Sequence, residues 1–133
     1  MKSLITSVVF GIIAIFVTTS AATSNRDICA SKAPNVMNAF SKFCSKPSGF
    51  NVPSNYAKTA HYSENHVAYV SIGGDDCKPA QWVPQQYCYS QFYDICAKGS
   101  QHGRGIGYYG RQLPGNGGGR CQTWMIAPLE YGV

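Results

Sequence analysis

The chain has 133 residues, of which 13% are charged and 44% are hydrophobic, and its formal net charge is +5. This length favours a single domain, and the sequence contains neither an internal repeat nor coiled-coil heptads. The excess of basic residues is mild and spread along the chain. It therefore favours approach to anionic surfaces such as cell walls, acidic glycans or nucleic acid, without specifying one of them.

The first 22 residues have the three parts of a secretory signal peptide. Met1-Lys2 gives a positive start, Leu4 to Val17 is a nearly unbroken apolar run, and Thr18 to Ala22 is a small-residue exit region. The apolar run is short for a membrane-spanning helix, and no basic stop-transfer cluster follows it. We therefore expect cleavage after Ala22, a secreted, extracellular protein, and one mature domain over residues 23–133.

All the cysteines lie in this expected mature domain. An even number of cysteines in a secreted chain is typical of disulfides, here three, whose connectivity the sequence leaves open. Their spacing contains no C-x2-C pair, so we expect no metal site and no cofactor. The cysteines are Cys29, Cys44, Cys77, Cys88, Cys96 and Cys121.

The first predicted helix begins near Pro34, after a polar stretch from Thr23 to Lys32. Ser31 is the predicted N-cap, and the breaker cluster from Lys46 to Gly49 ends the element. Between these limits, apolar residues recur at helical spacing. These residues are Val36, Met37, Phe40, Phe43 and Cys44.

The next stretch, Phe50 to Glu64, is polar and has no firm periodicity. We interpret it as a loop with one short strand around Ala57 to Tyr62. His66 to Ile72 alternates and is rich in β-branched and aromatic residues, which predicts a strand that ends at Gly73.

The segment from Val83 to Gly99 predicts the central helix. Pro84 suits a first helical position, and Gly99 is a typical stop. One apolar stripe follows the helical period through Cys88, Phe92, Ile95 and Cys96. Cys88 and Cys96 would be about 12 Å apart along the helix axis. Since a disulfide needs its two Cα atoms within about 7 Å, these two cysteines should pair with other elements rather than with each other.

A glycine-rich segment, Ser100 to Arg120, follows the central helix. Within it we expect a strand from Ile106 to Arg111 and a turn from Pro114 to Gly119. Cys121 to Ile126 predicts the closing strand, which Pro128 ends. In that strand Gln122, Trp124 and Ile126 should share one face, and Cys121, Thr123 and Met125 the other. We interpret Trp82 and Trp124 as residues that pack in the core or at its edge, rather than as ligand contacts.

Together these elements predict an α+β fold. A strand, a helix and a returning strand make a crossover unit, whose helix must pack on one face of the sheet. With the earlier helix on the same face, the expected architecture is a small two-layer sandwich. Two helices would pack on a mostly antiparallel sheet, with three disulfides.

The region from Val67 to Ile126 resembles small secreted cysteine-rich fungal proteins of the killer-toxin and necrosis-inducing effector type. The resemblance rests on the strand HVAYVSI, the cysteine-bearing helix, the glycine-rich segment and the closing strand RCQTWMI. It implies an effector or toxin-like protein acting on a host or competitor cell. No residue role carries over from this class.

The glycine-rich segment also carries the candidate binding residues, Arg104, Tyr108, Tyr109 and Arg111. Glycines let a ligand approach the backbone, tyrosines offer flat faces, and arginines supply a charged rim. The structural alternative is that the two tyrosines alternate in a strand, one packed inward and one exposed.

An enzymatic alternative is a small secreted ribonuclease. Such an enzyme needs a base–acid pair and a cation beside the phosphate, and His66, His102 and Arg104 supply these types. No spacing marks a site, and we interpret His61 and His66 as ordinary surface histidines. We therefore expect a non-enzymatic interaction protein with an extracellular or host-cell target, either protein or glycan. Nucleic acid is a partner only under the ribonuclease alternative.

Overall fold

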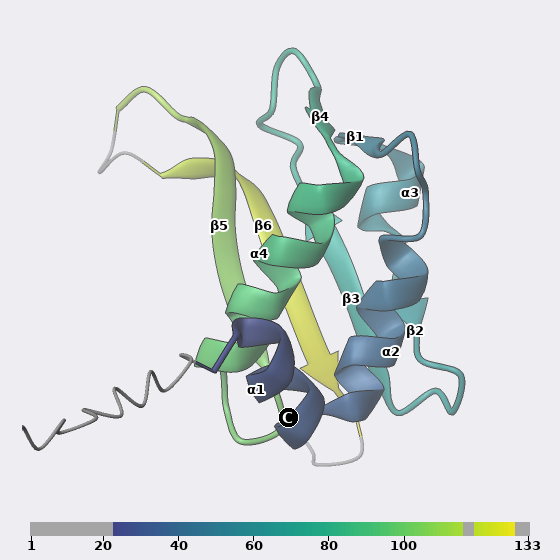
Figure 1. Cartoon of the computed structure of the whole chain (residues 1–133). Coiled ribbons are helices and arrows are strands. Elements are labelled where there is room, and N and C mark those ends of the chain that lie inside the picture. The colour runs from purple at the N-terminus through teal and green to yellow at the C-terminus, as the bar shows by residue number, and fades with distance from the viewer. Residues whose placement is uncertain (1–22, 116–118, 130–133) are drawn as a thin grey trace, which may run out of the picture.

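The structure, a computed structural model, describes residues 23–115 and 119–129. Helices lie on one face of an antiparallel sheet in a two-layer α+β arrangement, which confirms the predicted fold class (Figure 1). The expected signal peptide and part of the predicted turn at Pro114 to Gly119 lie outside the described residues. The described helices are α1 (Asn25–Lys32), α2 (Pro34–Phe43), α3 (Asn55–Lys58) and α4 (Gln85–Lys98), and the strands are β1 (Phe50–Val52), β2 (His61–Tyr62), β3 (Ala68–Gly73), β4 (Gln81–Val83), β5 (Gly105–Gln112) and β6 (Arg120–Pro128).

The main sheet has the strand order β2-β3-β6-β5, and β1 pairs with β4 in a separate small sheet. Every pairing in the two sheets is antiparallel. Because β6 runs antiparallel to both β3 and β5, the latter two strands run parallel to each other with β6 between them. Helix α4 lies between β3 and β5 in the chain, so the predicted strand–helix–strand crossover is present. It is a split crossover, because β6 lies between its two parallel strands.

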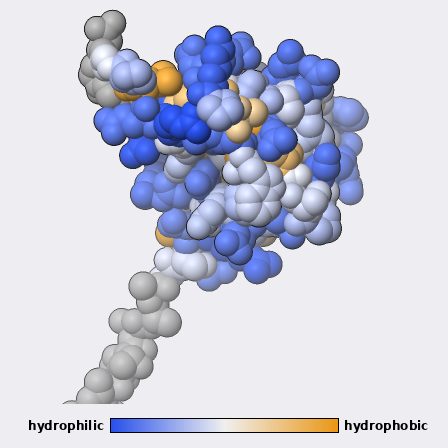
Figure 2. Space-filling view, turned by 90° about the horizontal axis from the view of Figure 1, so that it is seen from above, coloured by the Kyte–Doolittle hydropathy of each residue, from blue (hydrophilic) through white to orange (hydrophobic). Residues whose placement is uncertain are grey.

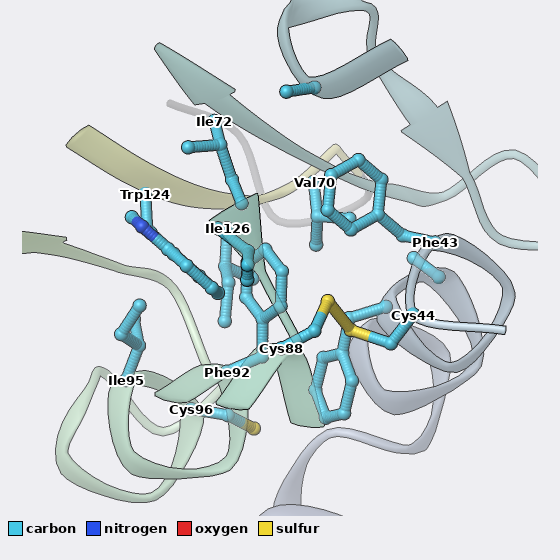
Figure 3. Close-up of a cluster of buried hydrophobic side chains, with 14 of the residues drawn as sticks. Phe43, Cys44, Val70, Ile72, Cys88, Phe92, Ile95, Cys96, Trp124 and Ile126 are labelled. Atoms are coloured by element: carbon cyan, nitrogen blue, oxygen red, sulfur yellow. A yellow bond between two sulfur atoms is a disulfide. The ribbon is translucent and has the colours of Figure 1, made fainter. Parts of the chain in front are cut away.

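Helix α4 lies on the inward face of the sheet and buries the predicted stripe of Cys88, Phe92, Ile95 and Cys96. Pro84 is its N-cap residue, so the helix begins one residue later than predicted. The Phe92 ring lies 5.5 Å from that of Phe40 in α2 and 4.8 Å from that of Trp124 in β6. This aromatic contact joins both helices to the sheet (Figure 3).

The alternation predicted for the closing strand is confirmed from Gln122 to Ile126, but Cys121, which was predicted to share the face of Thr123 and Met125, is buried and bonded to Cys77. Gln122, Trp124 and Ile126 of β6 are buried, whereas Thr123 and Met125 are exposed. The Trp124 indole Nε1 donates to the Gln122 Oε1 over 2.8 Å, so the buried indole keeps a hydrogen-bond partner. The inward face of the sheet is therefore the core face.

Three disulfides pair all six cysteines, each of which lies in the described ranges. Cys88 and Cys96 do not pair with each other, as their helical spacing requires. Cys29–Cys96 joins α1 to the end of α4, and Cys44–Cys88 joins the C-cap of α2 to the start of α4. Cys77–Cys121 joins the β3–β4 connection to β6. Helix α4 is thus bound covalently to two other helices.

The polar stretch from Thr23 to Lys32 contains a helix, α1, that the sequence prediction missed. Ser24 is its N-cap, and the Ser24 hydroxyl accepts a hydrogen bond from the Asp27 N–H. Ser31 lies inside α1, and Ala33 precedes α2, so the predicted N-cap was wrong. Helix α1 buries only Cys29, which explains why hydrophobic periodicity did not reveal it.

The stretch from Phe50 to Glu64, interpreted as a loop with one strand, contains three short elements. Strand β1 pairs with β4, and Ser54 caps α3 through a hydrogen bond from the Ala57 N–H. The predicted strand from Ala57 to Tyr62 is split between the end of α3 and β2. Elements of two to four residues are too short to produce a periodic pattern.

The turn after α4 passes close to α1 and α2 at Gly103. Its φ of 76° lies in the left-handed region, and a Cβ placed there would be 2.7 Å from the Ala33 Cβ and 3.0 Å from the Cys96 Sγ. Gly115 also has a left-handed φ, 91°, but a Cβ there would meet nothing within 4 Å. An alanine at Gly103 would meet both backbone strain and crowding, whereas an alanine at Gly115 would meet backbone strain alone.

We predict that Gly103→Ala lowers the free energy of unfolding by roughly 2–4 kcal/mol, through left-handed strain together with overpacking. Gly115→Ala should cost only about 1 kcal/mol, because strain alone acts there. Urea denaturation of both variants measures the difference. Equal losses would show that the turn does not pack against α1 as described.

Candidate functional site

Strand β5 carries three of the predicted binding residues, Tyr108, Tyr109 and Arg111, and has two different faces. Tyr108 points outward and is 63% exposed, whereas Tyr109 is half-buried beneath α4. The Tyr109 ring lies 5.2 Å from that of Trp124, and its hydroxyl donates to the Asp94 carboxylate over 3.3 Å. The two tyrosines thus alternate in a strand, and they cannot form one aromatic surface.

The inward face of β5 uses its glycines for helix packing. A Cβ at Gly107 would lie 2.7 Å from the Ile95 Cδ1, and one at Gly105 would lie 3.0 Å from the Ile95 Cγ2. Both glycines therefore let α4 approach the strand closely. Ile95 therefore occupies the space that a side chain at either position would need, and a depression of about 290 Å³ lies beside these residues.

The opposite side of the main sheet carries exposed aromatic and apolar side chains. Cross-strand partners share a face, and the register aligns Ile106 with Met125, and Tyr108 with Thr123. Tyr62 pairs with Tyr69 across the β2–β3 ladder, with ring centroids 5.5 Å apart. We call this surface the outward sheet face; it comprises Tyr62, Tyr69, Ile106, Tyr108, Thr123 and Met125.

Two predicted arginines lie at the ends of β5, and both are exposed. Arg104 immediately precedes the strand, and its backbone N–H donates to the Ser100 hydroxyl. The Arg111 Nη1 donates to the Lys78 carbonyl over 2.8 Å. The ion pair found in the described residues joins Lys98 to Asp94, so neither arginine has a carboxylate partner there.

The structure places the predicted ribonuclease histidines on different turns. His66 precedes β3, with its ring 5.7 Å from that of Tyr62 on the outward sheet face. His102 follows α4 and lines a depression of about 60 Å³ together with Lys32 and Pro128. Neither His66 nor Arg104 lines this depression. The catalytic role of the two histidines stays a prediction.

His61 is not the surface histidine that we expected. Its ring lies 4.7 Å from that of Phe43, and its Nε2 is 2.9 Å from the Tyr56 carbonyl oxygen. It is half-buried against the core. The described residues contain no group of three His, Cys, Asp or Glu side chains that could hold a metal ion.

Sequence reasoning missed two exposed aromatic residues beside the start of α4. Trp82 in β4 is 62% exposed and Tyr87 in α4 is 51% exposed. Of the core or edge position expected for Trp82, the core position is therefore wrong. Trp124 is fully buried, which confirms the packing role predicted for it. A groove lies between Trp82, Tyr87 and the end of β5. The signal in the sequence was weak, because β4 has only three residues.

Comparison of the chain with protein-family models, curated proteins and solved structures gave no significant match. No helix within residues 23–115 and 119–129 has the length and apolar character needed to cross a bilayer. Three disulfides in a small domain are typical of proteins that fold in oxidising compartments, which is consistent with an extracellular protein.

Tyr109 provides a test of the contact between β5 and α4. Burial, and then the charge and the hydrogen bond of the neighbouring Asp94 carboxylate, together raise the pKa of its phenol from 10.0 to about 12. The folded protein therefore holds the phenolic proton more tightly than the unfolded chain does. Stability from this group is complete below pH 10 and is lost as the pH rises from 10 to 12.

We predict that Tyr109→Phe costs about 1 kcal/mol of unfolding free energy below pH 10, through loss of the hydroxyl hydrogen bond. The difference between wild type and variant should shrink as the pH rises toward 12. Urea unfolding over this pH range measures it. A difference that is independent of pH would contradict the placement of Tyr109 beside Asp94.

Proposed function

We propose that this protein is a secreted, non-enzymatic interaction protein that acts on a host or competitor cell. We further propose that it contacts a protein on the surface of that cell through the outward sheet face. The observation that carries the proposal is the set of exposed aromatic and apolar side chains on this face, centred on Ile106, Tyr108 and Met125.

These side chains are held in position for binding by the sheet itself. Ile106 is 56% exposed and lies directly opposite Met125, and Tyr108 follows two residues later on the same face. Contiguous exposed apolar groups are typical of interaction sites on soluble proteins. Tyrosine, methionine and arginine are also enriched at the centres of protein interfaces. Because β5 and β6 fix the backbone, little conformational entropy would be lost on binding.

The charges at the edge of this face favour an acidic partner. Arg104 and Arg111 flank Tyr108 at the two ends of β5, and Arg120 begins the neighbouring strand. All three are exposed. A protein surface with an apolar centre and carboxylates at its rim would complement this arrangement, and the carboxylates would mainly raise the association rate.

Two further observations support action outside the producing cell. The disulfides suit an oxidising compartment, and the N-terminal 22 residues have the features of a signal peptide. The resemblance of Val67 to Ile126 to killer-toxin and necrosis-inducing effector proteins indicates a host or competitor cell as the target.

The test is binding of fluorescently labelled mature protein to intact yeast and plant cells, measured by flow cytometry. We predict saturable binding that weakens at high salt and is lost after the cell surface is treated with protease. The double variant Arg104→Ala/Tyr108→Ala should bind about tenfold more weakly or worse, as expected for residues near the centre of an interface. Arg111 is left unchanged, because its guanidinium also holds the Lys78 carbonyl.

The control removes the same charge but changes exposed residues on α1 and α4 that lie outside both proposed sites, Arg26→Ala/Ser90→Ala. It should bind as the wild type does, and both variants should keep the wild-type melting temperature. The proposal fails if no cell type shows saturable binding, or if the two double variants lose affinity equally. Binding that survives surface proteolysis would exclude a protein partner.

A further inference from the structure

A second site lies at the end of the molecule where β4 meets α4, away from the residues of the outward sheet face. A groove of about 180 Å³ is lined by residues from β4, α4, β5 and β6. Figure 2 looks down on this end, where pale residues of intermediate hydropathy lie among strongly hydrophilic ones. The lining residues that matter for the argument are Gln81, Trp82, Pro84, Tyr87, Gln91 and Gln122.

The groove extends past its two aromatic side chains. A neighbouring depression, lined also by Pro47 and Gln85, shares Trp82, Pro84 and Tyr87 with the first one. The two hollows, of about 180 and 480 Å³, therefore lie against the same aromatic residues, and we treat them together as the groove.

The indole of Trp82 is fixed in orientation although it is largely exposed. Its Nε1 donates to the Ser48 carbonyl over 2.8 Å, and its residue pairs with Asn51 across the β1–β4 ladder. A flat aromatic face is thus presented to solvent without freedom to turn away. Since its only donor is already used, the indole offers a ligand an apolar surface rather than a hydrogen bond.

Amide side chains supply the polar groups of the groove. The Gln81 Oε1 accepts hydrogen bonds from the backbone N–H of Arg111 over 2.8 Å and from the Gln122 Nε2 over 3.2 Å. These bonds hold the Gln81 and Gln122 side chains in place. The Gln91 Oε1 is buried and has no hydrogen-bond partner in the described part of the chain. A buried acceptor without a partner costs free energy, which a ligand donor would recover once the Gln91 side chain turns into the groove that this residue lines.

Neither hollow is lined by a charged side chain. The groove therefore combines apolar aromatic faces, a fixed amide pair and an unused acceptor, without charge. A sugar ring matches this chemistry, because it has an apolar C–H face and hydroxyl groups that both donate and accept. We propose that this groove binds a neutral oligosaccharide, with Trp82 and Tyr87 stacking on sugar faces and the Gln91 Oε1 accepting from a hydroxyl.

A proline-rich peptide is the other ligand that aromatic grooves commonly hold, but it fits less well. Such grooves recognise the polyproline II helix, whose carbonyls need donors. The Trp82 N–H is already donated to Ser48, so it cannot serve a proline carbonyl. Proline also has no N–H to satisfy the Gln91 Oε1.

The test titrates the mature protein with chitohexaose, laminarihexaose and cellohexaose, with decaproline as the peptide probe. Intrinsic fluorescence reports on the site, because Trp124 is fully buried and Trp82 is the exposed member of the two tryptophans. We predict that at least one of the three sugars binds and changes the emission of Trp82. Isothermal titration calorimetry gives the affinity for each variant.

Trp82→Ala and Tyr87→Ala should each weaken sugar binding about tenfold or more. Gln91→Leu, which removes the buried acceptor and keeps the side-chain volume, should also weaken it. The matched control is Tyr108→Ala, an exposed tyrosine on the outward sheet face, which should leave sugar affinity unchanged. Melting temperatures identify any variant that fails to fold. If Trp82→Ala does not fold, Tyr87→Ala provides the test of aromatic stacking.

The proposal is overturned if none of the three sugars binds at millimolar concentration. It is also overturned if decaproline binds in place of the sugars, or if Tyr108→Ala weakens sugar binding as much as Tyr87→Ala does. Because the probes are free sugars and the groove residues are not part of the outward sheet face, failure here leaves the proposed protein contact of that face untouched.

Discussion

Helix α4 is held from both ends by disulfides, and the rest of the structure depends on this constraint. Cys88 is bonded to Cys44 after α2, and Cys96 is bonded to Cys29 in α1. Between the two bonds, Phe92 packs against the aromatic core of α2 and β6. In a small domain the apolar core alone contributes limited stability, so covalent links of this kind add a substantial share. The helix layer therefore behaves as one unit that covers the inward face of the sheet.

The position of α4 also determines which surfaces remain available for binding. Helix α4 covers the inward face of β5, where the Tyr109 hydroxyl donates to Asp94 of the helix. Tyr108 lies on the opposite face of the strand and stays exposed. The N-terminal end of α4, together with β4, forms the groove around Trp82 and Tyr87. The two proposed sites thus use different residues of the same scaffold. Under the two proposals taken together, the protein would attach to a neutral polysaccharide through the groove and contact a protein through the outward sheet face.

Strong periodic patterns made the main elements predictable. The stripe from Cys88 to Cys96 and the alternation around Trp124 correctly indicated α4, β6 and the α+β fold. Helix α1 was missed because a disulfide, rather than an apolar stripe, holds it in place. The glycines of β5 were interpreted as ligand contacts, but spacing alone cannot show that Ile95 lies against them. The exposure of Trp82 depends on the pairing of β1 with β4. Each of these strands has only three residues, which is too short for a periodic pattern that would predict it.

The central claim is that α4 connects the helix layer through two separate disulfides. Digestion of the mature protein without reduction, followed by mass spectrometry of the linked peptides, tests this most directly. The account predicts the pairs Cys29–Cys96, Cys44–Cys88 and Cys77–Cys121. A peptide in which Cys88 is linked to Cys96, or in which either is linked to Cys77 or Cys121, would contradict the arrangement of α4 and both sites derived from it.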